Sequence, residues 1–336
     1  MSGGEVTCMQ CGETVVHDDR FCESCGTVLS DVRRVAVPAA APDPPSVCTE
    51  CGDGTYVDQY CSVCGERRAE PDRDQADLDG IVLITDRGLQ HPRNEDAAAA
   101  GVVACERGDA IAVAVCDGVS SSSAADTAAK GASAAGVEAM LNALVASGNS
   151  HSAVLAGLTA AAKAAAEAGA DTPSMEIAPS CTYAAVAIMP TSTGDVEVGV
   201  GNVGDSRVYW LPDPPAVPRR LTVDDSVAQE LISAGAAADS VAVRAGEHTL
   251  TRWLGADASA TPWSASGTPF ITVSDPGLLL LCSDGLWNYL PEAEDIAGIC
   301  AGKDVTTAAS TLVEYALAAG GQDNITVAVI PIGGRQ

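Results

Sequence analysis

The chain has 336 residues, of which 47% are apolar and 19% charged, so it can form a sizeable core and is not globally disordered. Its 45 acidic and 18 basic residues give a formal charge of −27, which opposes binding to nucleic-acid phosphates and to anionic membrane surfaces. It has no run of 18 or more apolar residues and no N-terminal signal peptide, so we expect a cytoplasmic protein with no nucleic-acid or membrane partner.

The first 65 residues contain a repeated cysteine pattern, CMQCGETVVHDDRFCESCG and CTECGDGTYVDQYCSVCG. The two-residue spacer in each CxxC lets both sulfurs face one point, and two such pairs close a tetrahedral Zn²⁺ site. We therefore predict two structural zinc ribbons, over 1–30 and 48–66, of the class that serves as interaction modules. Their two Zn²⁺ ions would be held by Cys8, Cys11, Cys22, Cys25, Cys48, Cys51, Cys61 and Cys64. A redox dithiol pair is disfavoured, because redox CxxC motifs occur singly in βα units.

Two stretches between these modules and the rest of the chain are predicted as linkers. Residues 31–47 (DVRRVAVPAAAPDPPSV) show no helical or strand period and predict an extended Ala/Pro linker, and 67–79 predict an acidic one. Because polar linkers would separate the ribbons from the C-terminal part of the chain, we expect residues 80–336 to fold by themselves.

From Ile81 onward the pattern is that of a globular α+β domain. Runs rich in β-branched residues predict strands at 81–85, 110–115, 182–188, 196–203, 206–211, 278–282 and 325–330. Ala-rich and amphipathic stretches predict helices at 124–146, 151–169, 225–237 and 304–319. Because the helices come in consecutive pairs, sheets covered by segregated helices fit better than βαβ alternation.

Acidic residues adjoin several of these strands. Asp117 and Asp284 follow apolar runs, Asp323 precedes one, and Glu95-Asp96 follow a polar loop. A carboxylate beside a buried strand costs several kcal/mol unless its charge is compensated. Carboxylates that converge at the ends of strands would repel one another, and hard divalent cations resolve that repulsion. Each Asp-Gly pair taken alone favours an ordinary turn over a metal site.

The order of the motifs is more specific than any one of them. The chain contains, in sequence, TDRGLQHPRNEDA, AVAVCDGV, SCTYAAVAI, VGNVGDSRVY, LTVDDS, HTLTRWLG, LLLLCSDGLW and GGQDNITVAVI. Over about 80–332 the chain thereby resembles the metal-dependent serine/threonine protein phosphatases, the PPM or type 2C family. The resemblance implies a four-layer α/β/β/α sandwich of two antiparallel sheets flanked by helices, preceded here by the two small zinc ribbons. It also implies two Mn²⁺ or Mg²⁺ ions at one end, with a weaker third.

The resemblance assigns roles residue by residue. The Mn²⁺/Mg²⁺ ligands are expected to be Asp117, Gly118, Asp284, Asp323 and Asp205. Asp117 would bridge two ions, Glu95 and Asp96 would hold metal-bound waters, and Asn324 would orient Asp323. The implied reaction is in-line attack on phosphorus by the metal-bridging water, without a phosphoenzyme.

His91 stands where the family usually has a phosphate-binding arginine, and Asp225 stands where a histidine is common. His91 has two possible roles: it contacts phosphate or donates a proton, or it is an ordinary loop histidine. Arg93 is the other candidate for holding phosphate.

The expected function is hydrolysis of phosphoserine and phosphothreonine in proteins, in opposition to bacterial Ser/Thr kinases and together with other components of their pathway. A catalytically weak phosphatase-like module that binds phosphoproteins, with ribbons that recruit partners, is the alternative. A zinc-ribbon nucleic-acid regulator is disfavoured, since neither ribbon is basic.

Overall fold

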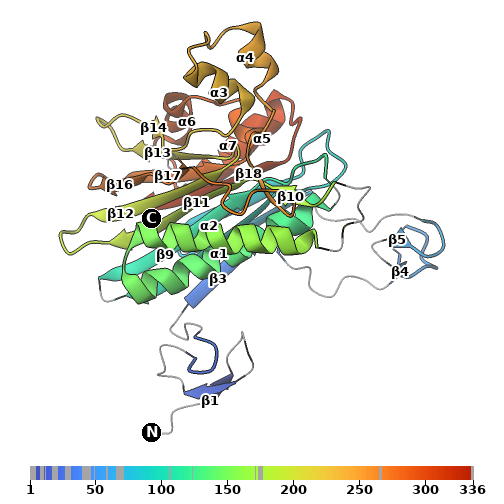
Figure 1. The fold of residues 1–336 in the computed structure, drawn as a ribbon, viewed down its shortest axis with the longest axis horizontal. Coiled ribbons are helices and arrows are strands. Elements are labelled where there is room, and N and C mark those ends of the chain that lie inside the picture. The colour runs from blue at the N-terminus through green and yellow to red at the C-terminus, as the bar shows by residue number, and fades with distance from the viewer. Residues whose placement is uncertain are drawn as a thin grey trace.

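The computed structural model describes residues 5–7, 11, 13–16, 22–26, 32–39, 47–48, 50–57, 60–65, 72–105, 107–122, 124–170, 172, 177–264 and 267–333. Its main body consists of two six-stranded antiparallel sheets that pack face to face (Figure 1). The first sheet has the order β16 (Phe270–Val273), β12 (Val196–Val203), β11 (Tyr183–Pro190), β9 (Gly108–Cys116), β8 (Ala97–Cys105), β3 (Val32–Val37). The second has the order β14 (Arg219–Arg220), β13 (Arg207–Pro212), β17 (Gly277–Cys282), β18 (Ile325–Ile332), β7 (Ile81–Asp86), β6 (Arg73–Leu78).

Helices cover the outer face of each sheet. α1 (Ala125–Ser147) and α2 (Ser150–Ala168) lie on the first sheet, and α5 (Asp284–Trp287), α6 (Ala293–Cys300) and α7 (Val305–Ala319) lie on the second (Figure 1). Three apolar clusters result, one under each helical layer and one between the sheets. The predicted four-layer sandwich is therefore confirmed. No helix in the described parts of the chain is both long enough and apolar enough to span a bilayer.

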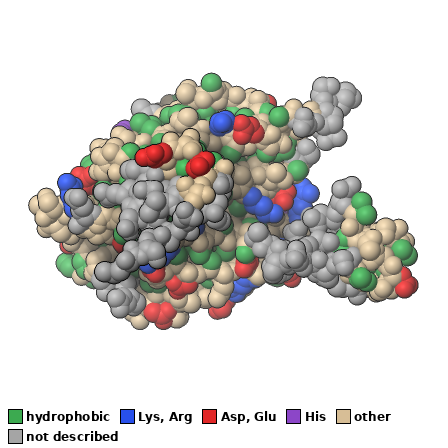
Figure 2. All heavy atoms as spheres, turned by 90° about the horizontal axis from the view of Figure 1, so that it is seen from below, with side chains coloured by type: hydrophobic (Ala, Val, Ile, Leu, Met, Phe, Trp, Pro, Cys, Tyr) green, Lys and Arg blue, Asp and Glu red, His purple; other side chains and the backbone are tan. Residues whose placement is uncertain are grey.

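The remaining elements are short. α3 (Val227–Ser233) and α4 (Val241–Ala245) form a small excursion after β14, and β10 (Ser180–Cys181) pairs with β15 (Leu254–Gly255). The predicted helix 225–237 is therefore shorter than expected, because the chain turns at Gly235 with a positive φ of 94°. In the N-terminal region, β1 (Glu5–Thr7) pairs with β2 (Thr14–Val16), and β4 (Tyr56–Val57) pairs with β5 (Tyr60–Cys61). The β4–β5 module projects at the right of Figures 1 and 2.

Both predicted linkers contain a strand, so their interpretation as linkers throughout is wrong. Val32–Val37 form β3, which pairs with β8 over six residues, and Arg73–Leu78 form β6, which pairs with β7 over six. Val37 and Leu78 are buried in the cluster between the sheets. In 31–47 the short VRRVAV run was obscured by the adjacent Ala/Pro stretch, and in 73–78 the charged outward positions concealed the apolar ones. Most side chains of these two strands are partly or fully exposed, so few of them need to be apolar.

β8 was not predicted either. Its sequence, AAAAGVVAC, begins with four alanines, which favour helix over strand when the chain is read locally. Ala97 and Ala99 are buried under the helical layer, and Ala98 and Ala100 are buried between the two sheets, while the neighbouring strands impose the extended conformation.

Candidate metal centres

The predicted Mn²⁺/Mg²⁺ ligands meet at one end of the sandwich. Asp117 follows β9, Asp284 begins α5 directly after β17, and Asp323 precedes β18. Asp205 lies in the turn between β12 and β13. These four aspartates and Gly118 line one cleft of about 570 Å³. Residues separated by more than 200 positions in the chain are thus brought to a single site.

Two glycines allow the strand ends to approach so closely. A Cβ atom at Gly118 would lie 2.6 Å from the carbonyl oxygen of Glu95, and one at Gly285 would lie 2.0 Å from that of Asn324. Both distances are far below van der Waals contact, so any side chain here would push apart the segments that carry the acidic residues. The two Asp-Gly pairs are therefore more than turn signals.

Without bound cations, it is energetically unfavourable to bury these carboxylates so close to one another. The pKa of Asp117 lies well above its usual range because of burial and the nearby Asp96. Burial also raises the pKa values of Asp96 and Asp205 to about 8, and the pKa of Asp323 rises through burial and its proximity to Asp284. One carboxylate oxygen of Asp96 and one of Asp284 are buried without a hydrogen-bond partner. Hard divalent cations would compensate both the charge and the unpaired oxygens, so the residues fit Mn²⁺ or Mg²⁺.

Hydroxyl groups hold the acidic side chains in place. Ser283 Oγ donates to Asp96 Oδ2 over 2.7 Å, and the backbone N–H of Asp117 donates to Thr182 Oγ1 over 3.0 Å. Thr182 also bonds Ser206 Oγ over 2.7 Å, which ties the Asp117 turn to the turn that carries Asp205. Thr182 lines the cleft, yet the sequence had marked it only as part of an apolar strand.

Asn324 joins the loops on the other side of the site. Its Oδ1 accepts from the backbone N–H of Glu95 over 2.7 Å, and its Nδ2 donates to the carbonyl oxygens of Arg87 (2.8 Å) and Arg93 (3.0 Å). Its backbone N–H donates to Asp323 Oδ1 over 2.8 Å. Asn324 therefore contacts Asp323 through its backbone, while its side chain fixes the loop that carries Glu95.

His91 and Arg93 are both engaged with acidic residues. His91 Nε2 lies 3.2 Å from Asp323 Oδ1, and Arg93 Nε donates to Glu95 Oε1 over 2.6 Å. Neither is among the described residues that line the cleft. The structure thus brings both beside the metal-ligand positions without aiming either into the cleft.

His248 is a cleft residue whose role the sequence had not singled out, although HTLTRWLG includes it. Its ring stacks on Trp287 with centroids 6.1 Å apart, and its Nδ1 lies 3.7 Å from Asp284 Oδ2. The nearby Asp284 carboxylate raises the pKa of His248. Asp225, the other departure from the family pattern, is buried, ion-paired with Arg252, and accepts from the backbone N–H of Gly204 over 3.2 Å. It anchors the turn that leads to Asp205.

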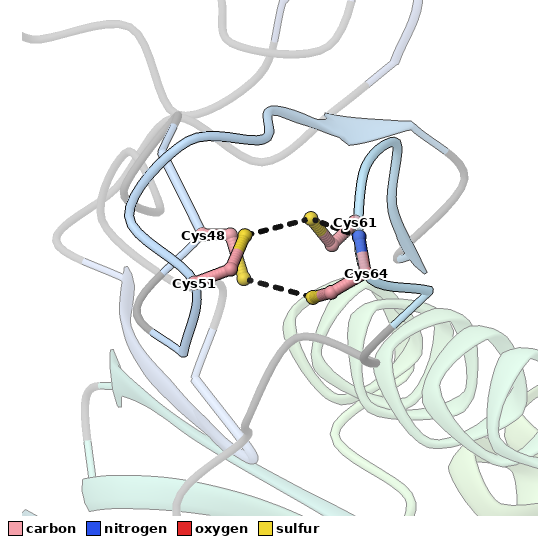
Figure 3. A group of neighbouring side chains, drawn as sticks. All are labelled: Cys48, Cys51, Cys61 and Cys64. Atoms are coloured by element: carbon pink, nitrogen blue, oxygen red, sulfur yellow. Dashed lines mark hydrogen bonds between the residues drawn. The ribbon is translucent and has the colours of Figure 1, made fainter.

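The second predicted zinc site is fully described. The sulfurs of Cys48, Cys51, Cys61 and Cys64 lie within 4.8 Å of one another and point to a common centre (Figure 3). The Cys48–Cys64 and Cys51–Cys61 sulfur distances are 3.7 and 3.6 Å. A tetrahedron with Zn–S bonds of about 2.3 Å has edges of about 3.8 Å, so the four sulfurs fit Zn²⁺. Hydrogen bonding to the backbone of Cys51 lowers the pKa of Cys48 to about 6, which favours the thiolate that zinc binds.

In the first ribbon, the sulfurs of Cys11, Cys22 and Cys25 form a similar cluster, and Cys11 and Cys22 lie 3.5 Å apart. The fourth predicted ligand, Cys8, lies outside the described residues. Within the described part of the chain, these two cysteine groups are the only sets of three or more His, Cys, Asp or Glu ligand atoms this close together. The aspartates of the cleft lie further apart.

Comparisons with known proteins address the ribbons and the sandwich separately. Residues 8–67 match the family described as Double zinc ribbon. The PPM Ser-Thr phosphatase MsPP from Mycobacterium smegmatis, solved with cacodylate, is 27% identical and covers 77% of this chain and 100% of its own, with a TM-score of 0.55. The catalytic domain of PstP, solved with two manganese ions, is also 27% identical, with 76% and 96% coverage and a TM-score of 0.55. The sandwich has the PPM phosphatase fold. The predicted resemblance, with an N-terminal double zinc ribbon, is confirmed.

Curated relatives point the same way. The serine/threonine phosphatase stp of Listeria innocua is 35% identical over 141 residues, and that of Listeria monocytogenes is 34% identical over the same length. Each match covers 40% of this chain and 51% of the relative, so the chain spans about half the length of the curated relatives it matches. Staphylococcus aureus Stp1, at 20% identity and a TM-score of 0.57, shares the fold.

Proposed function

We propose that this PPM-fold protein is a metal-dependent protein serine/threonine phosphatase that removes phosphate from phosphoserine and phosphothreonine. The observation that carries the proposal is the acidic cleft, where four buried or half-buried aspartates and one backbone carbonyl converge at the end of a PPM sandwich. The bacterial phosphatases among its relatives support phosphoproteins as substrates and a Ser/Thr kinase as the opposing enzyme.

Charge explains why such a cleft would need cations to act on phosphate. Its described lining contains Asp117, Asp205, Asp284 and Asp323 but no lysine or arginine. A phosphomonoester dianion would be repelled from these carboxylates in their ionised form. The proposed cofactors are therefore two Mn²⁺ or Mg²⁺ ions with a weaker third, and two structural Zn²⁺ in the ribbons.

When bound, such ions neutralise phosphoryl oxygens and lower the pKa of a water that attacks phosphorus. The chain's own residues hold the site. Asp117, Asp284, Asp323 and the Gly118 carbonyl would bind the two main ions, and Asp205 the third. Ser283 and Thr182 keep the acidic cluster in position through the hydrogen bonds described above. His91 and Arg93 remain the proposed phosphate contacts, and either would have to leave its acidic partner to reach the cleft.

The test is phosphate release from a phosphothreonine peptide by the full chain with added Mn²⁺, compared with Asp117→Asn. Because Asp117 would hold the two main ions, its replacement should lower turnover by at least about a hundredfold. Asp109→Asn is the matched control, because Asp109 is exposed at the opposite end of the same strand, β9. Equal activity of wild type and Asp117→Asn would refute the proposal.

A further inference from the structure

The second zinc ribbon is inserted between two edge strands of the sandwich, and both of its connections leave from the metal-site end. The last residue of β3, Val37, pairs with Ala98, two positions after Asp96. The first residue of β6, Arg73, pairs with Asp86, which also pairs with Ile325 beside Asp323. The chain therefore leaves the sandwich at this end after β3, forms the ribbon over 47–65, and returns to the same end.

The base of this insertion is bonded to the loops of the metal site. The backbone N–H of Ala39 donates to Asp74 Oδ2 over 2.6 Å, which joins the outgoing and returning segments. Arg87 donates from its backbone N–H to the Asp72 carbonyl and from Nε to Asp72 Oδ1, each over 2.7 Å. The carbonyl of Arg87 is in turn held by Asn324. The returning segment is thus connected to Glu95 through two residues, because Asp72 bonds Arg87, Arg87 bonds Asn324, and Asn324 bonds Glu95.

Short connections keep the ribbon near the site. Eight residue steps separate Ala39 from Val47 and seven separate Gly65 from Asp72. Fully extended segments of this length span at most about 25 to 29 Å. Because the ribbon is held at both ends, it stays within roughly that distance of Ala39 and Asp72, the two residues at the base of the insertion.

The second ribbon is small, yet four of its large apolar side chains are exposed to solvent. Val47, Val57, Tyr60 and Val63, called here the ribbon patch, are 48%, 59%, 55% and 64% exposed. Val57 and Tyr60 are cross-strand partners, so their side chains share one face of the hairpin. Figure 2 shows hydrophobic atoms on the surface of this lobe. The sulfurs of the four cysteines face one another, whereas the side chains of the ribbon patch face solvent and are available to contact another molecule.

We propose that the ribbon patch docks an apolar segment of the phosphoprotein substrate while the cleft binds its phosphorylated side chain. This inference rests on the proposed phosphatase function. It adds that docking at the ribbon patch determines which phosphoproteins reach the cleft. A partner bound at both places gains an effective concentration in the millimolar range from the short connections. A substrate is favoured over a second copy of this chain, because two copies with a charge of −27 repel each other.

The experiment compares three phosphothreonine peptides of identical sequence around the phosphate. One is the short peptide alone. The other two carry in addition a Leu- and Tyr-rich segment, joined on the N-terminal side in one and on the C-terminal side in the other by a ten-residue Gly/Ser spacer with an r.m.s. length of roughly 17 Å. With the full chain, we expect KM to fall about tenfold for at least one of the extended peptides, with kcat unchanged.

Tyr60→Ser/Val63→Ser should abolish that preference and leave the kinetics on the short peptide unchanged. Zinc content confirms that the ribbon is still folded, and replacement of 47–65 by a Gly/Ser linker should have the same effect as the double variant. The matched control is Val217→Ser, since Val217 is 71% exposed in the loop after β13, at the end of the sandwich away from the cleft. Equal KM values for all peptides, or a preference that survives in the double variant, would overturn the docking proposal. Failure to hydrolyse even the short peptide would instead refute the phosphatase function.

Discussion

The two edge strands, β3 and β6, should be required for the stability of the sandwich, although they precede the segment that carries the phosphatase motifs. A chain that begins at residue 80 lacks both, whereas one that begins at residue 27 lacks only the first ribbon. We expect the shorter chain to be strongly destabilised and the longer one to behave like the full protein. From the sequence we had expected residues 80–336 to fold by themselves.

The magnitude follows from two side chains. Val37 is fully buried and Leu78 is 7% exposed, both in the cluster between the sheets. Full burial of a valine or leucine contributes about 1.5–3 kcal/mol, so their loss costs about 3–6 kcal/mol out of a typical stability of 5–15 kcal/mol. At about 2–4 °C per kcal/mol for a domain of this size, the unfolding temperature should fall by at least about 6 °C. Removal of the strands also uncovers the edges of β8 and β7, which favours aggregation.

The assay is thermal and urea unfolding of the three chains, followed by circular dichroism, with hydrolysis of p-nitrophenyl phosphate as a second readout. If the chain from residue 80 is insoluble, the variant Leu78→Ala in the full chain replaces it in the test. This substitution should lower the free energy of unfolding by about 2–5 kcal/mol. Unfolding of the chain from residue 80 at the same temperature and urea concentration as the full protein would refute this role for the edge strands.

Three further predictions concern the zinc ribbons and the acidic cleft. Cys61→Ser should lower the zinc content from about two ions to about one per chain, measured by elemental analysis, because a four-thiolate site would lose a ligand; unchanged zinc would contradict this assignment. In the metal-free protein, Asp96 and Asp205 keep their protons in the folded state up to a pKa of about 8 and release them near their ordinary value when unfolded. The folded state then binds more protons between about pH 4 and 8, so the urea midpoint should fall as pH rises through that window, and a rising midpoint would contradict the expectation. If His91 holds phosphate, His91→Arg should lower KM for small phosphoesters and His91→Ala should raise it, whereas Arg93→Ala will be the damaging change if Arg93 holds it; steady-state kinetics that are unchanged in all three variants would remove both residues from the site.

Much of the site could be predicted from the sequence because its acidic residues adjoin strongly apolar strands. Asp117, Asp284 and Asp323 each lie within two positions of a strand that the local pattern predicted. Antiparallel pairing of β17 with β18 brings Asp284 and Asp323 together, whereas Asp117 follows β9 in the other sheet and reaches them because the two sheets pack face to face. The cysteine clusters were predictable for a simpler reason, since all four ligands of one site lie within 17 residues.

The missed features depend on contacts between distant parts of the chain. The alanines of β8 and the mixed residues of β3 and β6 become strands because neighbouring strands pair with them, which no local pattern reveals. His248 enters the cleft through its stacking on Trp287, which is 39 positions away. Thr182 reaches Asp117 from the junction between β10 and β11, where the adjacent apolar pattern concealed it.

The central claim, that the acidic cleft is a metal-dependent phosphatase site, is tested most directly by adding metals back to metal-free protein. Phosphate release from a phosphothreonine peptide is measured with chelator alone, and then with Mn²⁺, Mg²⁺ or Zn²⁺ in excess over it. We expect background release with chelator, recovery with Mn²⁺ or Mg²⁺ that saturates with concentration, and no recovery with Zn²⁺ alone, because zinc restores the ribbons but not the site that favours hard cations. Full release in excess chelator would contradict it.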